Sequence, residues 1–108
     1  MMGERPEYQL KLTLNDRKIS RVIIDQHYRL SHAESINDDI ILDLIRTLDG
    51  KKIPPEKVKG KFEYFTVEPA YRLAMPYRLV LVLCLTDTYL GVVNAFRVNE
   101  VANVKVSK

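Results

Sequence analysis

The apolar run "LVLVLCL" at residues 79–85 limits most strongly how this chain can fold. Leucines at the odd positions alternate with Val80, Val82 and Cys84, so an extended chain presents apolar side chains on both faces. Such a strand is stable in the middle of a sheet, where both faces are covered. The run has seven residues, far fewer than the roughly 20 that a bilayer-spanning helix needs. We therefore expect a central strand and no membrane partner.

Other segments show the alternation expected of strands. Residues 8–14 alternate in this way, and after the turn signal "NDRK" residues 19–25 return as a second strand, which predicts an N-terminal hairpin. Residues 62–69 and 89–98 are also predicted strands, and "TDT" at 86–88 has the length of a hairpin loop. Two segments stay open: "AYRLAM" is a connection or a short strand, and "NEVANVKVSK" adds an edge strand or remains loose.

The clearest helix signal covers residues 36–49. Isoleucines and leucines recur there at helical spacing, Ser35 can cap the start, Asp38 and Asp39 lie near the positive end, and Gly50 supplies a stop. The predicted fold class is α+β: an N-terminal β-hairpin and one long amphipathic helix packed on a twisted, mainly antiparallel sheet.

A chain of 108 residues is enough for a single domain, 1–108. Within it we expect residues 1–6 and about 103–108 to be loose. The Pro- and Lys-rich segment 51–61 is predicted to be a basic, mobile loop.

Composition and missing motifs narrow the function classes. A net charge of +3 and a pI near 9.0 permit anionic partners without demanding them. The single cysteine, Cys84, lies in the apolar run, which predicts a buried structural thiol and a reducing compartment. The N-terminus lacks the apolar core of a signal peptide, so the expected location is cytoplasmic. Gly-rich phosphate loops and zinc-binding motifs are missing, so we expect no cofactor, no nucleotide cofactor and no metal site.

The stretch "QHYRLSHAES" holds both histidines of the chain, His27 and His32, with Arg29 between them. Metal-free cleavage of RNA needs a base for the ribose 2′-proton, an acid for the leaving oxygen and cations for the developing charge. Two imidazoles and an arginine satisfy that requirement. The alternative is that His27 ends the second strand and His32 is a solvated residue before the helix.

A second set of candidates comes from the strands. On a regular strand Arg97 shares a face with Gly91 and Ala95, where it would point into a shallow groove opposite the helix and hold the scissile phosphate. Asn94 would then be a polar residue on an apolar face. Cations and aromatic side chains that interleave along the sheet suit single-stranded RNA. The candidate substrate-binding residues are Arg29, Lys61, Tyr64, Arg78 and Asn94.

The order of elements, a helical region followed by a compact antiparallel sheet, resembles the small RNase toxin group that includes RelE, barnase and the colicin-type tRNases. The features that match are the histidine stretch before "SINDDIILDLIRTLDG" and the arginine in "VVNAFRV". The resemblance implies a sheet that supports a metal-free site, with His27, His32 and Arg97 in the catalytic positions. Residues 23–98 also resemble a family of small uncharacterised bacterial proteins, through "HYRLSH", "INDDIILDLIRTLDG" and "YLGVVNAFR".

Two functions from different classes follow. The first is a metal-independent endoribonuclease of bacterial toxin type, with His27 and His32 as general base and acid. The second is a non-enzymatic protein-interaction module: an antitoxin- or immunity-like protein, or a homodimeric α+β domain. The first requires the fold to bring Arg97 to the histidines; the second does not.

Overall fold

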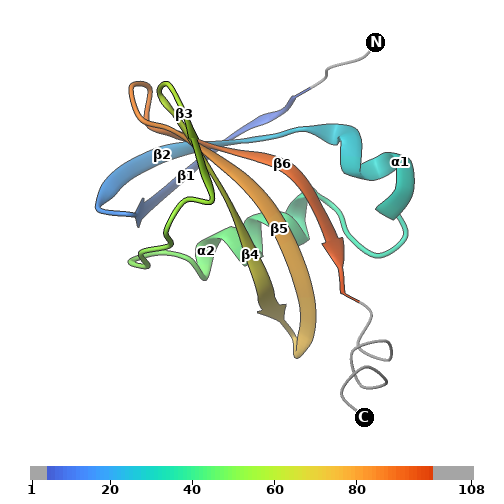
Figure 1. Cartoon of the computed structure of the whole chain (residues 1–108). Helices are drawn as coiled ribbons and strands as arrows, with labels where there is room; N and C mark the ends of the chain where they lie inside the picture. The colour runs from blue at the N-terminus through green and yellow to red at the C-terminus, as the bar shows by residue number, and fades with distance from the viewer. Residues whose placement is uncertain (1–4, 99–108) are drawn as a thin grey trace.

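The computed structural model describes residues 5–98, and most of its regular structure belongs to one sheet. The strands are β1 (Glu7–Leu14), β2 (Arg17–Ile24), β3 (Lys57–Lys59), β4 (Phe62–Arg72), β5 (Met75–Cys84) and β6 (Tyr89–Arg97). They lie in the order β1-β2-β6-β5-β4-β3 (Figure 1). The β2–β6 pair is parallel and the other pairs are antiparallel. The predicted N-terminal hairpin is present, and β5 is a central strand.

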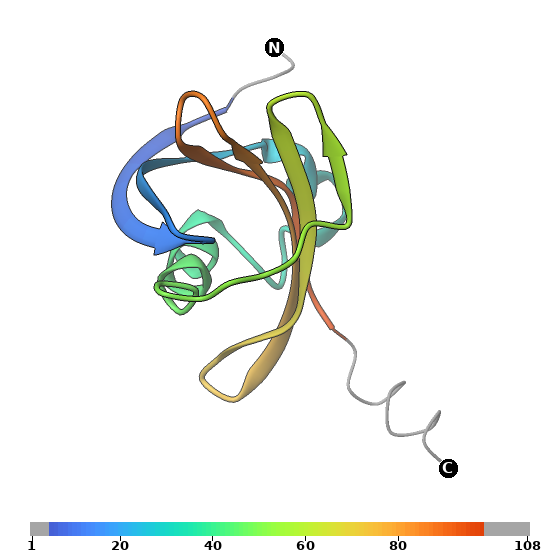
Figure 2. The same ribbon diagram turned by 60° about the vertical axis from the view of Figure 1, so that its left-hand side comes forward.

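The predicted fold class, with one long helix laid on a mainly antiparallel sheet, is wrong. The structure is 53% strand and 17% helix, and its six strands form a curled, mixed half-barrel. Figure 2 shows the curl, with α2 (Asp38–Arg46) lying inside it. The parallel β2–β6 pair joins the N-terminal hairpin to the rest of the strands, so the hairpin extends the same sheet. Strand twist accumulates across six strands and bends the sheet around the short helix.

The main helix is shorter than predicted at both ends. α2 has 9 residues because Asn37, and not Ser35, is its N-cap: the Asn37 side chain accepts a hydrogen bond from the Ile40 N–H at 2.9 Å. At the other end the chain tightens into turns, and the Thr47 hydroxyl donates to the Leu44 carbonyl at 2.6 Å. Gly50 then adopts a positive φ of 85°, which ends the segment.

The histidine stretch folds into two short helical turns between β2 and α2. A 3-10 turn covers Gln26–Tyr28, and α1 covers Arg29–His32. The carboxylate of Asp25 caps the first turn by accepting the His27 N–H at 2.8 Å. The segment therefore turns the chain from the sheet toward the helix.

The two faces of the sheet have different environments. Leu81 and Leu83 of β5 belong to the same buried core as Ile41 and Ile45 of α2. Successive strand residues point to opposite faces, so Val80 and Val82 lie on the face opposite α2, where they are half-buried. We call this second face the outer face. Cys84 is buried, as predicted.

Several smaller predictions from the sequence can be compared with the structure. β4 and β5 extend through most of "AYRLAM" and meet at a tight turn, Leu73–Ala74, so this segment is part of a hairpin. Part of the expected mobile loop 51–61 is the edge strand β3. Residues 1–4 and 99–108, which include most of the two predicted loose ends and the tail "NEVANVKVSK", lie outside the described residues. Over residues 5–98 there is no helix with the length and apolar character to cross a membrane.

Candidate functional site

The two histidines have different surroundings. His27 is exposed, and its ring makes no hydrogen bond within residues 5–98. His32 is half-buried and its ring stacks on Phe96 of β6, with 4.9 Å between the ring centroids and an interplanar angle of 30°. His32 is therefore a packing partner of the sheet.

A β-bulge in β6 decides on which face Arg97 lies. Two successive residues, Val93 and Asn94, face the single residue Val80, so the alternation of side chains reverses after Val92. Phe96 consequently lies on the outer face, whereas Arg97, paired with the buried Tyr77, lies on the side of α2. The prediction that Arg97 shares a face with Gly91 is therefore wrong.

The structure shows no direct contact among the three predicted catalytic residues. His32 contacts β6 through Phe96, and Arg97 leaves that strand from the opposite face. In the part of the chain that the structure describes, no hydrogen bond, ion pair or ring stacking joins His27, His32 and Arg97.

Three of the predicted binding residues already have protein partners. Arg29 donates to the side chain of Gln26 and lies 4.0 Å from the Asp38 carboxylate. Arg78 pairs with Glu68 at 3.0 Å. Asn94 accepts the N–H of the next residue in its own strand at 2.9 Å. The other two, Lys61 and Tyr64, lie at a groove on the outer face.

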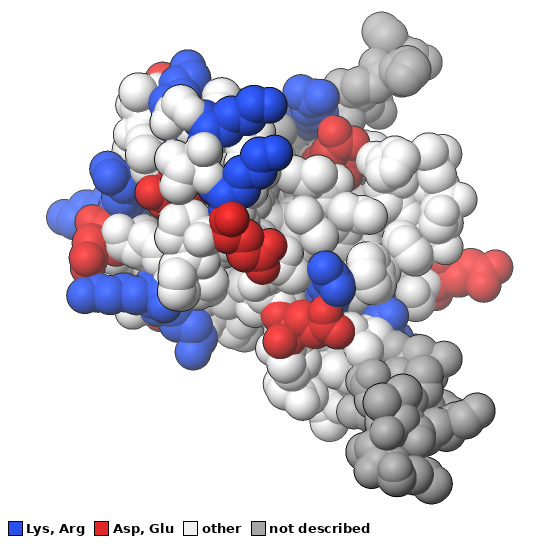
Figure 3. Space-filling model, in the orientation of Figure 1, with Lys and Arg blue, Asp and Glu red and all other residues white. Residues whose placement is uncertain are grey.

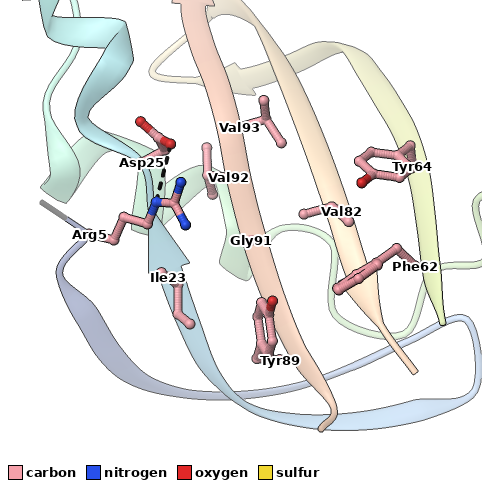
Figure 4. Close-up of a pocket in the computed structure, with 10 residues that line it drawn as sticks. All are labelled: Arg5, Ile23, Asp25, Phe62, Tyr64, Val82, Tyr89, Gly91, Val92 and Val93. Atoms are coloured by element: carbon pink, nitrogen blue, oxygen red, sulfur yellow. Dashed lines mark ion pairs between the residues drawn. The ribbon is translucent and has the colours of Figure 1, made fainter. Parts of the chain in front are cut away.

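This groove has a volume of about 510 Å³ and crosses four strands, from β2 through β6 and β5 to β4. Its lining is mainly apolar and aromatic, and we call it the aromatic groove. The lining residues are Arg5, Ile23, Asp25, Phe62, Tyr64, Val82, Tyr89, Gly91, Val92 and Val93 (Figure 4). Its volume is in the range typical of ligand sites, about 300–1,000 Å³.

The floor of the aromatic groove is low because Gly91 has no side chain. A Cβ at this position would lie 2.8 Å from Cγ1 of Val82 on the neighbouring strand. Figure 4 shows Tyr89 on one side of this floor and Phe62 and Tyr64 on the other. The rings thus flank a depression on an open sheet face.

An ion pair lies at the β2 end of the groove. Nε of Arg5 is 3.4 Å from Oδ2 of Asp25, and the two side chains are 63% and 33% exposed. Figure 4 shows the pair beside Ile23 and Val92. Both charged groups are within reach of a ligand in the groove.

Three lysines extend the groove at its other end. In the β3–β4 pair, Lys57 lies opposite Tyr64 and Lys59 lies opposite Phe62. Directly opposed residues of an antiparallel pair project from the same face, so both lysines flank the rings. Nζ of Lys61, in the hairpin turn, is 5.5 Å from the centroid of the Phe62 ring. We call Lys57, Lys59 and Lys61 the lysine hairpin.

The balance of charge on the outer face favours an anion. Besides the Asp25–Arg5 pair, Glu7 pairs with Arg21 at 3.3 Å, and Glu68 pairs with Arg78. At the edge, Glu56 accepts the Thr66 hydroxyl at 3.3 Å. Within residues 5–98 no ion pair engages the exposed lysine hairpin. Figure 3, which views this face, shows uncharged surface between charged side chains of both signs.

A buried polar network holds the histidine stretch against α2. The Asp38 carboxylate, which is only 9% exposed, accepts hydrogen bonds from the hydroxyls of Tyr8 and Tyr28 at 2.5 Å each and from Gln26 at 3.2 Å. Burial alone would raise the pKa of Asp38, but hydrogen bonds from Tyr28, Tyr8 and Gln26 together lower it. The hydrogen bond to Asp38 raises the pKa of Tyr8 to about 12. Asp38 does not line the aromatic groove, so we assign the network a positioning role.

Sequence reasoning missed most of the groove. It singled out Lys61 and Tyr64, but not Phe62, Tyr89 or the Arg5–Asp25 pair. One local signal was available: "KVKGKFEYF" places alternate lysines and alternate aromatic residues on either side of Gly60, the pattern of a hairpin with one basic and aromatic face. Among residues 5–98, no group of three or more His, Cys, Asp or Glu side chains is arranged to hold a metal ion.

Comparisons with protein-family models, with curated proteins and with solved structures found no match.

Proposed function

We propose that this protein binds single-stranded nucleic acid, with RNA as its partner, on the outer face of the sheet. One observation carries the proposal: the β3–β4 register places Lys57 beside Tyr64 and Lys59 beside Phe62, all directed to the same face. Cations next to aromatic rings are the combination that single strands require, because phosphates pair with the cations while bases stack on the rings.

The shape of the face supports a single strand over a duplex. In a duplex the base faces are covered by neighbouring base pairs, so only a single strand can lay a base on Phe62 or Tyr64. The aromatic groove is also shallow and open, lined by strands and not by a protruding helix that would enter a major groove. A partner of this class is consistent with the buried thiol of Cys84, which suits the reducing cytoplasm.

The proposal retains RNA as the partner and leaves out cleavage. His27 and His32 lie on the two short turns before α2, Arg97 leaves β6 on the side of α2, and none of them lines the aromatic groove. The protein is proposed as a nucleic-acid-binding module, which differs from both the endoribonuclease and the protein-interaction module derived from the sequence.

The test is the affinity of the full chain for a fluorescently labelled ten-nucleotide RNA, measured by anisotropy. Loss of one stacked base costs about 1–3 kcal/mol, so we expect Tyr64→Ala to weaken binding by about 5- to 150-fold. The matched control is Tyr71→Ala: Tyr71 is also in β4 and is 56% exposed, but it lies outside the aromatic groove.

We expect the Tyr71→Ala variant to bind the RNA as tightly as the wild type. Equal losses in the two variants would place the RNA elsewhere on the molecule. An absence of binding by the wild type at low salt would exclude the proposed function and favour a protein partner.

A further inference from the structure

We propose that the Arg5–Asp25 end of the aromatic groove recognises guanine. The inference rests on the proposed function, because it assigns a base preference to the same binding surface. It depends on three features of the structure: the bonding capacity left on Asp25, the groups that Arg5 presents, and the distance across the groove.

The Asp25 carboxylate is held in place but is not saturated. Its Oδ1 accepts the His27 N–H at 2.8 Å, and its Oδ2 lies 3.4 Å from Nε of Arg5. A carboxylate has about four acceptor sites, so two remain available to a ligand. The side chain is 33% exposed and lines the groove, so a ligand there can reach these sites.

Arg5 supplies donors beside that acceptor. Only its Nε faces Asp25, which leaves the N–H groups of the two terminal nitrogens for a ligand. Figure 4 shows the guanidinium over the boundary between β2 and β6, at the end of the groove floor. The end of the groove therefore presents an anionic acceptor next to a cationic donor.

Guanine matches this arrangement better than the other bases. Its Watson–Crick edge carries two adjacent donors, N1–H and N2–H, which fit a carboxylate, and the neighbouring O6 is an acceptor that suits an arginine. Adenine, cytosine and uracil each present a single donor group on that edge, next to acceptors that a carboxylate repels. A site that combines Asp25 with Arg5 thus discriminates by both attraction and repulsion.

The groove has room for the base together with a neighbour. From β2 to β4 there are three strand spacings, about 14 Å in total. One base can stack on Phe62 or Tyr64 beside the lysine hairpin while a base further along the same RNA strand reaches Asp25. Tyr89 lies at the Phe62 end of the groove, and the Arg21 guanidinium packs 5.2 Å from its ring centroid, which orients the ring.

The experiment compares ten-nucleotide RNAs that differ at one position. An all-uridine RNA is the reference, and the others carry a single central guanine, inosine or adenine. One bidentate contact discriminates by about 5- to 150-fold, so we expect the guanine RNA to bind about tenfold tighter than the reference. Inosine lacks the 2-amino group and should lose most of that gain, and adenine should show none.

The variant Asp25→Asn tests the residue. Asparagine keeps the size of the side chain and an oxygen for the His27 N–H, but it removes the charge and one acceptor atom. We expect the guanine RNA to bind this variant within about twofold of the all-uridine RNA. The control, Asp16→Asn, changes an exposed aspartate in the β1–β2 turn and should keep the full preference. Thermal melts confirm that both variants are folded.

The outcomes separate the two proposals. If the wild type binds all four RNAs with one affinity, or if Asp25→Asn keeps the tenfold preference, the guanine assignment is overturned while the proposed function stands. If no RNA binds, the proposed function fails and the assignment fails with it.

Discussion

Lys59 lies directly opposite Phe62 in the β3–β4 pair, so an exposed cation and a half-buried ring project side by side from the outer face. Lys57 and Tyr64 repeat the relationship two residues further along the strands. The lysines thus form a row along β3 and the rings a row along β4, and each lysine–ring pair is about 7 Å from the next. This surface is the basis of the binding predictions.

Removal of charge from β3 should change the salt dependence of RNA binding. Each phosphate contact on a single strand contributes about 0.7 to the slope of log K against log salt. We expect the double variant Lys57→Gln/Lys59→Gln to bind more weakly and to lower that slope by about 1.4. The measurement is anisotropy over a range of salt concentrations.

The control for this experiment is Lys51→Gln/Lys52→Gln, which removes the same charge from the segment after α2. The slope of log K against log salt should fall in this control by less than half as much as in Lys57→Gln/Lys59→Gln, because neither Lys51 nor Lys52 lies on the outer face. A control slope that falls as far would show that net charge alone governs binding.

Gly91 is predicted to tolerate no side chain. In Gly91→Ala the new Cβ would meet Val82 at 2.8 Å, and overpacking of this kind costs about 1–3 kcal/mol. We expect urea unfolding to show that loss, together with weaker RNA binding because the groove floor rises. The double variant Gly91→Ala/Val82→Ala should recover part of the stability; failure to recover would argue against the clash.

The hydroxyl of Tyr28 should contribute substantially to stability. It donates a 2.5 Å hydrogen bond to the buried carboxylate of Asp38, and loss of a bond to a charged group costs about 1.5–3 kcal/mol. Tyr28→Phe should lower the free energy of unfolding by that amount. Tyr71→Phe, at an exposed position, should change it by less than about 0.5 kcal/mol.

The same network predicts a loss of stability at alkaline pH. The hydrogen bond to Asp38 raises the pKa of Tyr8 to about 12, above its ordinary value of 10.0. A group whose pKa is higher in the folded state contributes its full stabilisation of the fold at pH values below the pKa of the unfolded chain. This stabilisation is lost as the pH rises through the pKa of the folded state. We therefore expect stability to fall between about pH 10 and 12.

Denaturant midpoints across this pH range test the prediction. Tyr8→Phe should flatten the fall, although Tyr28, whose pKa is raised by burial and by Asp38, should leave part of it. Identical pH profiles in wild type and variant would contradict a role for Tyr8.

We expect substitution of the two histidines to change the stability of the protein by different amounts and to have no effect on RNA cleavage. His32→Ala removes the ring stacked on Phe96 and should cost about 0.5–1.5 kcal/mol beyond the lost burial, whereas His27→Ala should cost less than about 0.5 kcal/mol. We expect wild type and both variants to leave labelled RNA intact in EDTA. Cleavage by the wild type that is lost in both variants would restore the ribonuclease interpretation.

Local patterns in the sequence predicted the strands well. Alternation identified the N-terminal hairpin and the central strand β5, because burial of one or both faces of a strand determines the order of its apolar and polar side chains. The prediction of a long helix was wrong, because the apolar residues continue at helical spacing beyond the residues that form helical hydrogen bonds. Asn37 takes an extended conformation and caps α2 two residues after the expected cap.

The candidate site was less predictable. Tyr64 and Lys61 could be selected from residue type, but the Arg5–Asp25 pair joins residues 20 positions apart, and Tyr89 faces Phe62 across two strand boundaries. No local sequence pattern indicates that residues so far apart in the chain lie close together.

The sequence by itself determined most of the extended segments and the turns between them, although residues 51–61, which include the edge strand β3, were predicted to be a mobile loop. Only the tertiary structure decided which face each side chain occupies. The parallel pairing of β2 with β6 extends the sheet around α2, and one extra residue at Val93 reverses the direction of every later side chain in β6. Such choices depend on contacts between segments that are distant in the chain, so Arg97 lies on the side of α2 and the aromatic groove forms without it.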